Sequence, residues 1–469
     1  MPPTLALMLW AVLLLVLLRF DPAREPNTSW ALWVPVIWIS ILGSRLPSQW
    51  LGSQVGVAAK ALEEGNPIDR TVSLLLILLA IGILLSRSFN WLGFFSRNLA
   101  LMAFLLFAVV SVAWSDFPLV AFKRWVRDLG NYFVLLVALS DPCPVEAIRT
   151  VLRRLSYLLI PLSVVLIKYY PEIGKSWDPW TGIAQYSGVT TGKNMLGALC
   201  LVCGLFFFWD TVTRWADRKA PRTRRIIQLN VAFIAMAVWL LELSNSATSS
   251  ICLVLGCLII AAARSKTAKR RPIVLTLGIP VAICFYLTLA FGFGLDLKDA
   301  VAQAVGRDPT LTDRTKIWSF LLSMKINPLL GVGYESFWLG PRLEWFWQNA
   351  DLGHINEAHN GYLEVYLNLG IVGLFFLGWF VIASYWTISR RFARSCLGPL
   401  CLSVWAVTLL YSATEAGFRT GLVWLTFLMG AIGVPERTSN KALAFDTSAF
   451  ESGGGKGLSS VPLSHSFRR

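Results

Sequence analysis

Charged side chains are scarce in this sequence, and the shortage limits the kinds of protein that it can be. Asp, Glu, Lys and Arg make up 15% of the 469 residues, compared with about 25% in ordinary soluble domains. A chain of this length would otherwise fold as about three soluble domains. So few charges cannot coat three surfaces that face water, and the composition therefore excludes a string of soluble domains.

Signs of disulfides, metals and nucleotides are also missing. Six of the eight cysteines lie inside long apolar runs and the other two lie beside such runs, so no disulfide framework is expected. Cys200 and Cys203 have metal or redox spacing, but their apolar surroundings without a nearby His favour packing. The chain has three His, no Asp-x-Asp pair for a metal-bound nucleotide sugar, and no P-loop. We therefore expect neither a metal nor a cofactor.

The apolar residues, 55% of the chain, gather in long runs that predict membrane-spanning helices. A helix needs about 20 mostly apolar residues to cross a bilayer, and most runs are apolar on all sides, as in helices surrounded by lipid or other helices. We predict an all-α, polytopic membrane helix bundle of about 12–13 spans with one long periplasmic loop. The candidate spans are residues 3–19, 30–47, 71–87, 99–114, 129–140, 150–169, 194–213, 226–244, 248–264, 273–294, 361–386, 397–413 and 420–435.

These spans divide the chain into four regions. Residues 1–294 hold the first ten spans and residues 361–435 the last three. Between them, residues 295–360 form one long outer loop, and loops of this length inside a compact protein are usually functional. Residues 436–469 are rich in Ser and Gly and predict a disordered cytoplasmic tail.

Basic residues set the predicted orientation. The richest short loops are 214–225, 264–271 and 390–394, and an even number of spans separates them, so all three are predicted to be cytoplasmic. The same alternation makes residues 87–98 and 141–149 cytoplasmic. It leaves on the outer side residues 48–70, 115–128, 170–193, 295–360 and 414–419. The net charge of +15 is thus largely a topology signal, and nucleic-acid binding is not expected.

A smaller set of basic residues lies on the predicted outer side, against this bias. Arg124 and Arg127 are three positions apart, on one face of a helix. Lys193, followed by Asn194, opens a span, and Arg314 lies in the long loop. Guanidinium groups match phosphate oxygens, so these residues predict binding of an anion such as pyrophosphate. The alternatives are lipid headgroup contacts or local salt bridges with Asp128 and Asp313.

His359 precedes the span that begins at residue 361. A helix N-terminus disfavours the charged imidazolium, so a neutral imidazole at the outer interface is a candidate general base. Tyr362 and Tyr366, three and seven positions further on, lie on the same helix face. The alternative is that His359 is a helix cap or a polar surface residue.

Five stretches between about residue 185 and residue 375 resemble, in order, the O-antigen ligase and polymerase (Wzy/WaaL-like) family of bacterial membrane glycosyltransferases. They are Gly188–Asn194 (GVTTGKN), Leu243–Ser249 (LSNSATS), Asp308–Trp318 (DPTLTDRTKIW), Asn327–Trp338 (NPLLGVGYESFW) and His359–Gly373 (HNGYLEVYLNLGIVG). The LTDR and SAT forms look most like the exopolysaccharide-polymerase branch. Asp313 stands where the family usually has Gly, and would partly neutralise Arg314. Gly192 stands where the branch usually has His.

The resemblance implies a metal-independent glycosyltransferase in the bacterial inner membrane, with its active face in the periplasm. Its donor would be a glycan on undecaprenyl pyrophosphate, and an acceptor hydroxyl would displace the lipid pyrophosphate at the anomeric carbon. Arg314 and His359 would be catalytic. Pyrophosphate would be bound by Arg124, Arg127, Lys193 and Asn194. Weaker glycan contacts are expected from Trp338, Tyr362 and Tyr366, with anchoring at the bilayer surface as the alternative for the loop tryptophans.

Several functions remain open at this point. The protein is predicted to polymerise lipid-linked repeat units into exopolysaccharide or O-antigen, with a flippase and a chain-length regulator as the partners that the resemblance implies. The alternative is a ligase that transfers the finished glycan to another acceptor. A flippase and a structural scaffold are less favoured. A flippase needs a cationic path through the bilayer, and residues 226–263 contain no Lys or Arg.

Overall fold

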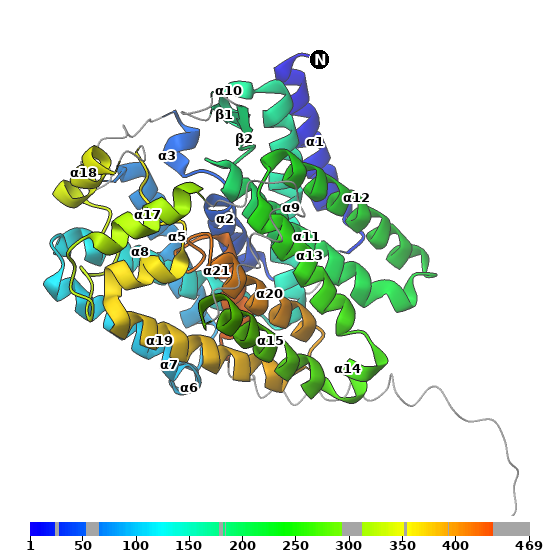
Figure 1. Ribbon diagram of the computed structural model, residues 1–469. Coiled ribbons are helices and arrows are strands. Elements are labelled where there is room, and N and C mark those ends of the chain that lie inside the picture. The colour runs from blue at the N-terminus through cyan, green and yellow to red at the C-terminus, as the bar shows by residue number, and fades with distance from the viewer. Residues whose placement is uncertain are drawn as a thin grey trace, which may run out of the picture.

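The computed structural model describes residues 1–23, 28–52, 65–177, 182, 184–292, 312–350, 354–392 and 394–434. Within them the chain is a helical bundle (Figure 1), which confirms the predicted all-α fold. The β-structure described is one antiparallel hairpin of β1 (Lys175–Trp177) and β2 (Ala184–Tyr186), in which Lys175 pairs with Tyr186. The predicted tail, residues 436–469, lies outside the described residues.

Each predicted span falls on a helix. The helices of the first half are α1 (Pro3–Phe20), α2 (Trp33–Leu42), α3 (Pro47–Trp50), α5 (Pro67–Ser86), α6 (Trp91–Arg97), α7 (Leu99–Val110), α8 (Pro118–Leu139), α9 (Pro144–Tyr169), α10 (Pro171–Gly174) and α11 (Lys193–Arg214). Those of the second half are α12 (Pro221–Ser244), α13 (Ala247–Ala262), α14 (Lys266–Arg270), α15 (Pro272–Gly292), α17 (Thr312–Ser323), α18 (Gly340–Asn349), α19 (Gly361–Phe392), α20 (Gly398–Tyr411) and α21 (Leu422–Ala431). Short 3-10 turns cover Trp30–Leu32, Ser111–Trp114 and Trp215–Asp217.

Six of the described helices are long and apolar enough to cross a membrane, namely α1, α5, α9, α11, α12 and α19. A seventh span is possible if α6 and the helical stretch Leu99–Trp114 count as one, although the chain bends by 91° between them. The other predicted spans fall on shorter apolar helices or, in α8, on a helix whose first half carries charge. The chain is therefore a multi-pass membrane protein.

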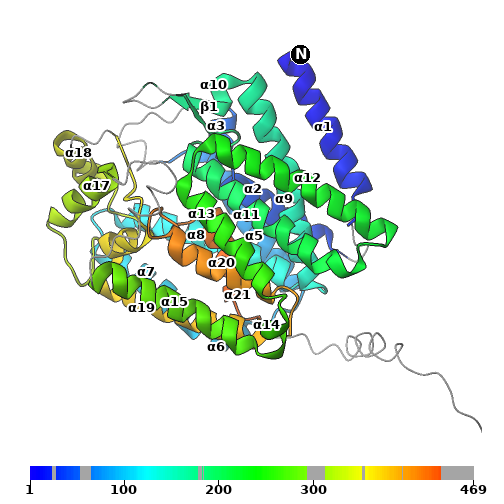
Figure 2. The ribbon, with the colours of Figure 1, turned by 45° about the vertical axis from the view of Figure 1, so that its right-hand side comes forward.

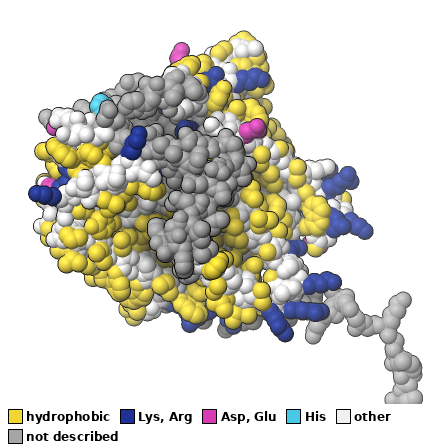
Figure 3. All heavy atoms as spheres, in the orientation of Figure 1, with side chains coloured by type: hydrophobic (Ala, Val, Ile, Leu, Met, Phe, Trp, Pro, Cys, Tyr) yellow, Lys and Arg dark blue, Asp and Glu magenta, His cyan; other side chains and the backbone are white. Residues whose placement is uncertain are grey.

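The bundle has a buried centre and an apolar exterior. In α11, 83% of the most apolar 18-residue stretch is buried inside the protein, whereas in α1 the buried share of that stretch is 6%. Figures 1 and 2 accordingly place α11 among the other helices and α1 at the margin. Apolar side chains cover much of the face drawn in Figure 3, and Lys and Arg lie mainly at its edges, at the right and below near the ends of α12 and α14 and also at the left and at the top. This separation is what a bilayer requires of a spanning bundle.

Contacts between connecting segments agree with the predicted alternation of sides. Pairs that join two predicted outer segments are Arg124–Glu335, Arg314–Glu415 and Glu335–Arg419. Arg87 and Asp141 join two predicted cytoplasmic segments, and Asn98 of the first of these contacts Gly433 near the cytoplasmic end of the last predicted span. The segments expected on one side of the membrane thus meet at one end of the bundle.

A break in α19 positions one wall of the polar end. Gly370 has φ +65° and interrupts the helix. The freed backbone pairs with the segment after Asn327, because the N–H of Ile371 donates to the carbonyl of Pro328 at 2.9 Å and the N–H of Gly333 donates to that of Asn368 at 2.9 Å. A side chain at Gly370 would meet the carbonyl oxygen of Leu329 at 2.2 Å. The Asn327–Trp338 stretch is therefore held against α19, with Tyr334 and Glu335 at the pocket described below.

Candidate functional site

The connection between α20 and α21, residues 412–421, lies at the centre of the polar end. The N–H of Gly361, the first residue of α19, donates to the carbonyl oxygens of Ser412 at 2.7 Å and Glu415 at 2.9 Å. The hydroxyls of Thr414 and Thr248 lie 2.8 Å apart. This connection therefore ties the start of α19 to the Leu243–Ser249 stretch.

Glu415 in this connection holds two of the predicted catalytic residues. Its Oε1 accepts a hydrogen bond from Nη2 of Arg314 at 2.5 Å, and its Oε2 lies 3.4 Å from Nδ1 of His359. The Glu415 side chain is 5% exposed and that of Arg314 is 20% exposed. The structure thus brings Arg314 and His359 together through a buried carboxylate. This carboxylate restricts the motion of both side chains.

His359 faces a second carboxylate as well. Its Nδ1 lies 2.9 Å from Oε1 of Glu357, whose side chain is 36% exposed. Burial by itself lowers the pKa of His359, but Glu357 and Glu415 more than offset this effect and raise the pKa to about 9. The same contact lowers the pKa of Glu357, against the raising effect of its partial removal from water. The expectation of a neutral imidazole is therefore wrong for this geometry, because two acidic neighbours outweigh a helix dipole.

A second pair of charges lies beside the first. Arg419 makes a bidentate contact with Glu335, with Nε at 3.2 Å from Oε1 and Nη2 at 2.8 Å from Oε2. Burial raises the pKa of Glu335, but Arg419 and Arg124 lower it by more. The backbone carbonyl of Glu335, a residue with φ +49°, accepts from Nη1 of Arg124 at 2.5 Å. Glu335 thus binds two arginines, Arg419 through its carboxylate and Arg124 through its backbone carbonyl.

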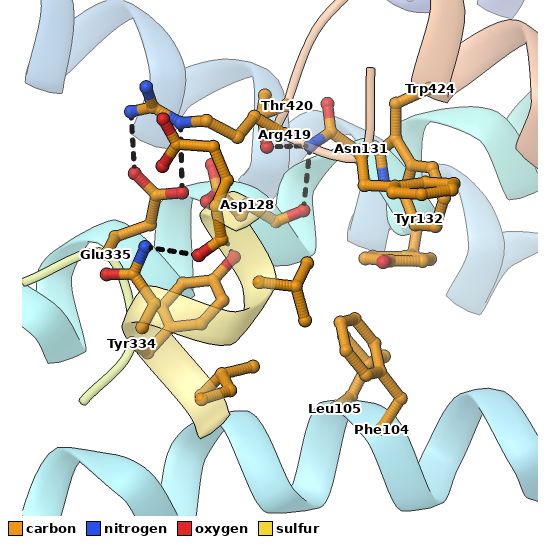
Figure 4. Close-up of a pocket in the computed structure, with 15 residues that line it drawn as sticks. Phe104, Leu105, Asp128, Asn131, Tyr132, Tyr334, Glu335, Arg419, Thr420 and Trp424 are labelled. Atoms are coloured by element: carbon orange, nitrogen blue, oxygen red, sulfur yellow. Dashed lines mark hydrogen bonds and ion pairs between the residues drawn. The ribbon is translucent and has the colours of Figure 1, made fainter. Parts of the chain in front are cut away.

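Asp128 completes the arrangement from α8. Its Oδ1 accepts from Nε and Nη2 of Arg127 at 3.2 Å each, so the local salt bridge considered from the sequence is present. Its Oδ2 accepts from the hydroxyl of Tyr334 at 2.9 Å, as Figure 4 shows. Burial raises the pKa of Tyr334 well above its usual value, so the phenol stays neutral and donates. The side chain of Arg127 is 48% exposed and remains accessible.

A pocket opens between these groups. It is lined by Asp128, Tyr334, Glu335 and Arg419, and Figure 4 shows aromatic side chains, among them Phe104 and Trp424, around the same space. Its volume is about 40 Å³, which is room for water molecules but not for a sugar. A large substrate would therefore meet the charged rim of this site in the described conformation.

Trp338 is not available to a glycan. Its side chain is 5% exposed and packs edge-on against Phe337 and Phe346. Its Nε1 donates to Oε2 of Glu364 at 3.0 Å, and the N–H of Ala358 donates to Oε1 of Glu364 at 2.5 Å. In this structure the Trp338 ring therefore fills a core and holds Glu364, which also binds the backbone N–H of Ala358, the residue before His359, and the buried ring does not support the expected stacking role.

Among the described residues, no hydrogen bond or ion pair joins the remaining predicted residues to these charged groups. Tyr362 is 37% exposed, and its hydroxyl donates to the carbonyl of Leu409 at 3.0 Å. Tyr366 is half-buried against the core beneath α17 and α18. Lys193 and Asn194 begin α11, whose Gly197 packs on Ser246 and Ser249. The Asp313 side chain lies outside what the structure describes.

Glu357, His359 and Glu415 could also hold a cation. The ligand atoms of Glu357, His359 and Glu415 lie within 4.8 Å of one another. The geometry favours an ion-pair cluster instead, because Arg314 already occupies one oxygen of Glu415 and a protonated imidazole cannot ligate a metal. The expectation of no metal stays a prediction.

Sequence reasoning missed the acidic partners Glu335, Glu357 and Glu415. Acidic residues carry no orientation signal, so nothing in the sequence marks them apart from other loop residues. Arg419 was missed as well, although it is a basic residue in the predicted outer segment 414–419. Arg419 lies on the predicted outer side against the usual bias, as Arg124 and Arg314 do, so the same signal marks it.

Fold and site define a class: a polytopic helical membrane protein with arginines and carboxylates clustered at one end. Residues 231–378 match the family model described as O-antigen ligase. The chain is also 25% identical, over 368 residues, to the exopolysaccharide production protein ExoQ of Rhizobium meliloti (strain 1021), covering 74% of this chain and 79% of that protein. These comparisons confirm the resemblance to the O-antigen ligase and polymerase family.

Proposed function

We propose that this protein is a membrane glycosyltransferase that polymerises lipid-linked oligosaccharide repeat units into a surface polysaccharide. One observation carries the proposal: Arg124, Arg127, Arg314, His359 and Arg419 gather at one end of the bundle, next to a segment that matches the O-antigen ligase family. Similarity to ExoQ over 74% of the chain favours the exopolysaccharide branch. We infer that this end faces the periplasm, because the loops at the opposite end of the bundle carry the excess of Lys and Arg, which is typical of the cytoplasmic side.

The donor in this proposal is a glycan on undecaprenyl pyrophosphate. The oxygen of an acceptor hydroxyl forms a bond to the anomeric carbon, and the bond from that carbon to the phosphate oxygen breaks. Its electron pair leaves with the lipid pyrophosphate, whose charge Arg314 and the imidazolium of His359 stabilise. Arg127, which is half exposed at the rim, can meet the pyrophosphate first.

The acceptor proton needs a base. In the described geometry His359 is an acid rather than a base at neutral pH. Glu357 is the more exposed of its two carboxylate neighbours, at 36% against 5% for Glu415. We therefore assign Glu357 as the group that takes the hydroxyl proton as the glycosidic bond forms. The imidazolium of His359 stabilises the negative charge of the leaving group.

The test is reconstitution with a lipid-linked repeat unit as the sole substrate. A polymerase makes a ladder of products, because the repeat unit is both donor and acceptor. Arg314→Ala and His359→Ala are expected to abolish the ladder while the protein still inserts. The matched control is Arg342→Ala, which removes an exposed salt bridge to Asp116 and should leave the ladder intact.

The second candidate is a ligase that transfers a finished glycan to another acceptor, and the family match over residues 231–378 favours it. A ligase makes no ladder from the repeat unit alone and forms product only when a second acceptor is added. Lipid scrambling without any glycosidic product would contradict both candidates, and an unchanged product in the Arg314→Ala variant would contradict the catalytic role of Arg314.

A further inference from the structure

The carboxylate of Glu335 contacts Arg419 in the way that a phosphate group would (Figure 4). Its two oxygens accept from Nε at 3.2 Å and from Nη2 at 2.8 Å. Guanidinium groups make the same parallel, two-bond contact with phosphate. The Arg419 side chain is 30% exposed, so a ligand at the surface can approach it. A substrate anion forms these two bonds only if the carboxylate leaves.

Two further arginines act on the same carboxylate. Burial raises the pKa of Glu335, but the positive charges of Arg419, Arg124 and Arg127 lower it by more. Arg124 also donates to the backbone carbonyl of Glu335, and the Arg127 side chain is 48% exposed at the rim. Three guanidinium groups thus favour a negative charge at the position of this carboxylate. That position suits a phosphate for the same reason.

Three carboxylates line the pocket, those of Asp128, Glu335 and Glu364, and they differ in how firmly they are held. Among the described residues, the side chain of Glu335 makes its hydrogen bonds with Arg419 alone. Asp128 binds a guanidinium and a phenol. Glu364 binds an indole N–H and a backbone N–H. An entering anion therefore displaces Glu335 at the loss of contacts with one residue.

The backbone around Glu335 is held by contacts that do not involve its carboxylate. The N–H groups of the next two residues both donate to Oδ1 of Asn368, at 2.9 Å and 3.1 Å. The N–H of the preceding residue donates to Oγ of Ser111 at 2.9 Å. The pocket of about 40 Å³ adjoins the carboxylate and leaves room for water beside it. The side chain can thus turn away from Arg419 through its own torsions, without unfolding the segment.

We propose that Arg419 binds the pyrophosphate of the donor and that Glu335 occupies this binding position until the donor arrives. The inference rests on the proposed function and deepens it, since it names the group that the anion displaces. The phosphate takes over both hydrogen bonds to Arg419, and the carboxylate turns toward water. The guanidinium is paired before and after the exchange, which avoids a partly buried charge without a partner. Displacing the carboxylate lowers the apparent affinity for the anion.

The experiment measures the binding of inorganic pyrophosphate to the purified full-length protein in detergent by isothermal titration calorimetry. Glu335→Gln keeps the size of the side chain but removes the competing charge, so this variant should bind pyrophosphate about tenfold more tightly than the wild type. A purely structural role of Glu335 predicts the opposite sign, because its loss would loosen Arg419 and weaken binding. Glu344→Gln is the matched control, because Glu344 is an exposed acidic residue in α18, and it should bind as the wild type does.

Two further variants complete the test. The double variant Glu335→Gln with Arg419→Lys should lose the gain, because an ammonium group cannot make the two-bond contact. If Glu335→Gln does not fold, Glu335→Asp replaces it; the shorter carboxylate competes less well, so a smaller gain is expected.

Unchanged, weaker or undetectable binding in folded Glu335→Gln, or an equal gain in the control, would overturn the inference. Because this assay requires no glycosyl transfer, it is separate from the test of the proposed function. Tighter binding in Glu335→Gln without any polymer from the wild type would refute the polymerase alone. Polymer formation without tighter binding would refute the role of Glu335 alone.

Discussion

Glu415 joins the two residues that the sequence singled out for catalysis: one carboxylate oxygen lies 2.5 Å from Nη2 of Arg314 and the other 3.4 Å from Nδ1 of His359. The carboxylate is buried, so its charge acts on both groups through little intervening water. It holds Arg314 in one orientation and favours the imidazolium form of His359. Glu415 is thus a positioning residue that acts through its neighbours.

Glu415→Gln should therefore change the pH profile as well as the rate. The amide keeps the shape of the side chain but removes the charge that raises the pKa of His359. We expect polymer formation to fall by about 10–100-fold and its alkaline limb to move to lower pH. Glu172→Gln, an exposed acidic residue in α10, is the control. A fall in rate with an unmoved profile would leave Glu415 with a structural role alone.

The protonation state of His359 predicts a direction for the pH dependence. Its pKa is raised to about 9 from an ordinary value of 6.5, so the imidazolium is the working form at neutral pH. If it stabilises the leaving pyrophosphate, activity is constant near pH 7 and falls about tenfold by pH 10. A rate that rises through pH 9 would make His359 a base. The His359→Gln variant should lose the titration.

The same shift predicts how stability varies. A folded-state pKa above the unfolded value stabilises the protein fully below about pH 6.5, and this contribution is lost as the pH rises through about 9. The unfolding temperature of the wild type should therefore decrease over that window more than that of His359→Gln. This comparison separates the charge of His359 from its part in catalysis, since it requires no substrate.

Removing Arg419 should cost more than removing an exposed ion pair. In Arg419→Ala, Glu335, which is 14% exposed, loses its bidentate partner next to the carbonyl that holds Arg124. Breaking a fully buried pair costs about 3–5 kcal/mol, and this pair should cost less, because the Arg419 side chain is 30% exposed. In Arg342→Ala the partner Asp116 is 58% exposed, and the loss should be about 0–1 kcal/mol. Unfolding temperatures measure both, and equal effects would contradict the assigned roles.

The helices could be predicted from the sequence because length and apolarity act locally, and each candidate span falls on a helix. The ion pairs could not, because their partners are distant in the chain. Glu415 lies 101 residues from Arg314, and Glu335 lies 84 residues from Arg419. Trp338 shows the same limit, since a loop tryptophan has one sequence signature whether it faces a sugar or fills a core. Only the packing against Phe346 shows that Trp338 fills a core.

The break in α19 was also beyond sequence reasoning, and it gives the last prediction. Gly370 needs φ +65°, and a Cβ there would lie 2.2 Å from the carbonyl oxygen of Leu329. Because the neighbour is backbone, relief requires moving the segment that carries Tyr334 and Glu335. Gly370→Ala should therefore lower the yield of folded protein and destabilise it by several kcal/mol, at or above the 1–3 kcal/mol typical of overpacking.

The matched control for Gly370→Ala is Gly378→Ala in the same helix, where a Cβ would meet nothing within 4 Å. Since Ala is the better helix former, this change should be neutral or stabilise the helix by up to about 1 kcal/mol. Size-exclusion profiles and unfolding temperatures in detergent compare the two variants. Equal behaviour would mean that the chain does not need the break, whereas loss of folded protein in Gly370→Ala alone ties the kink to the placement of Glu335 and, through it, of Arg124 and Arg419.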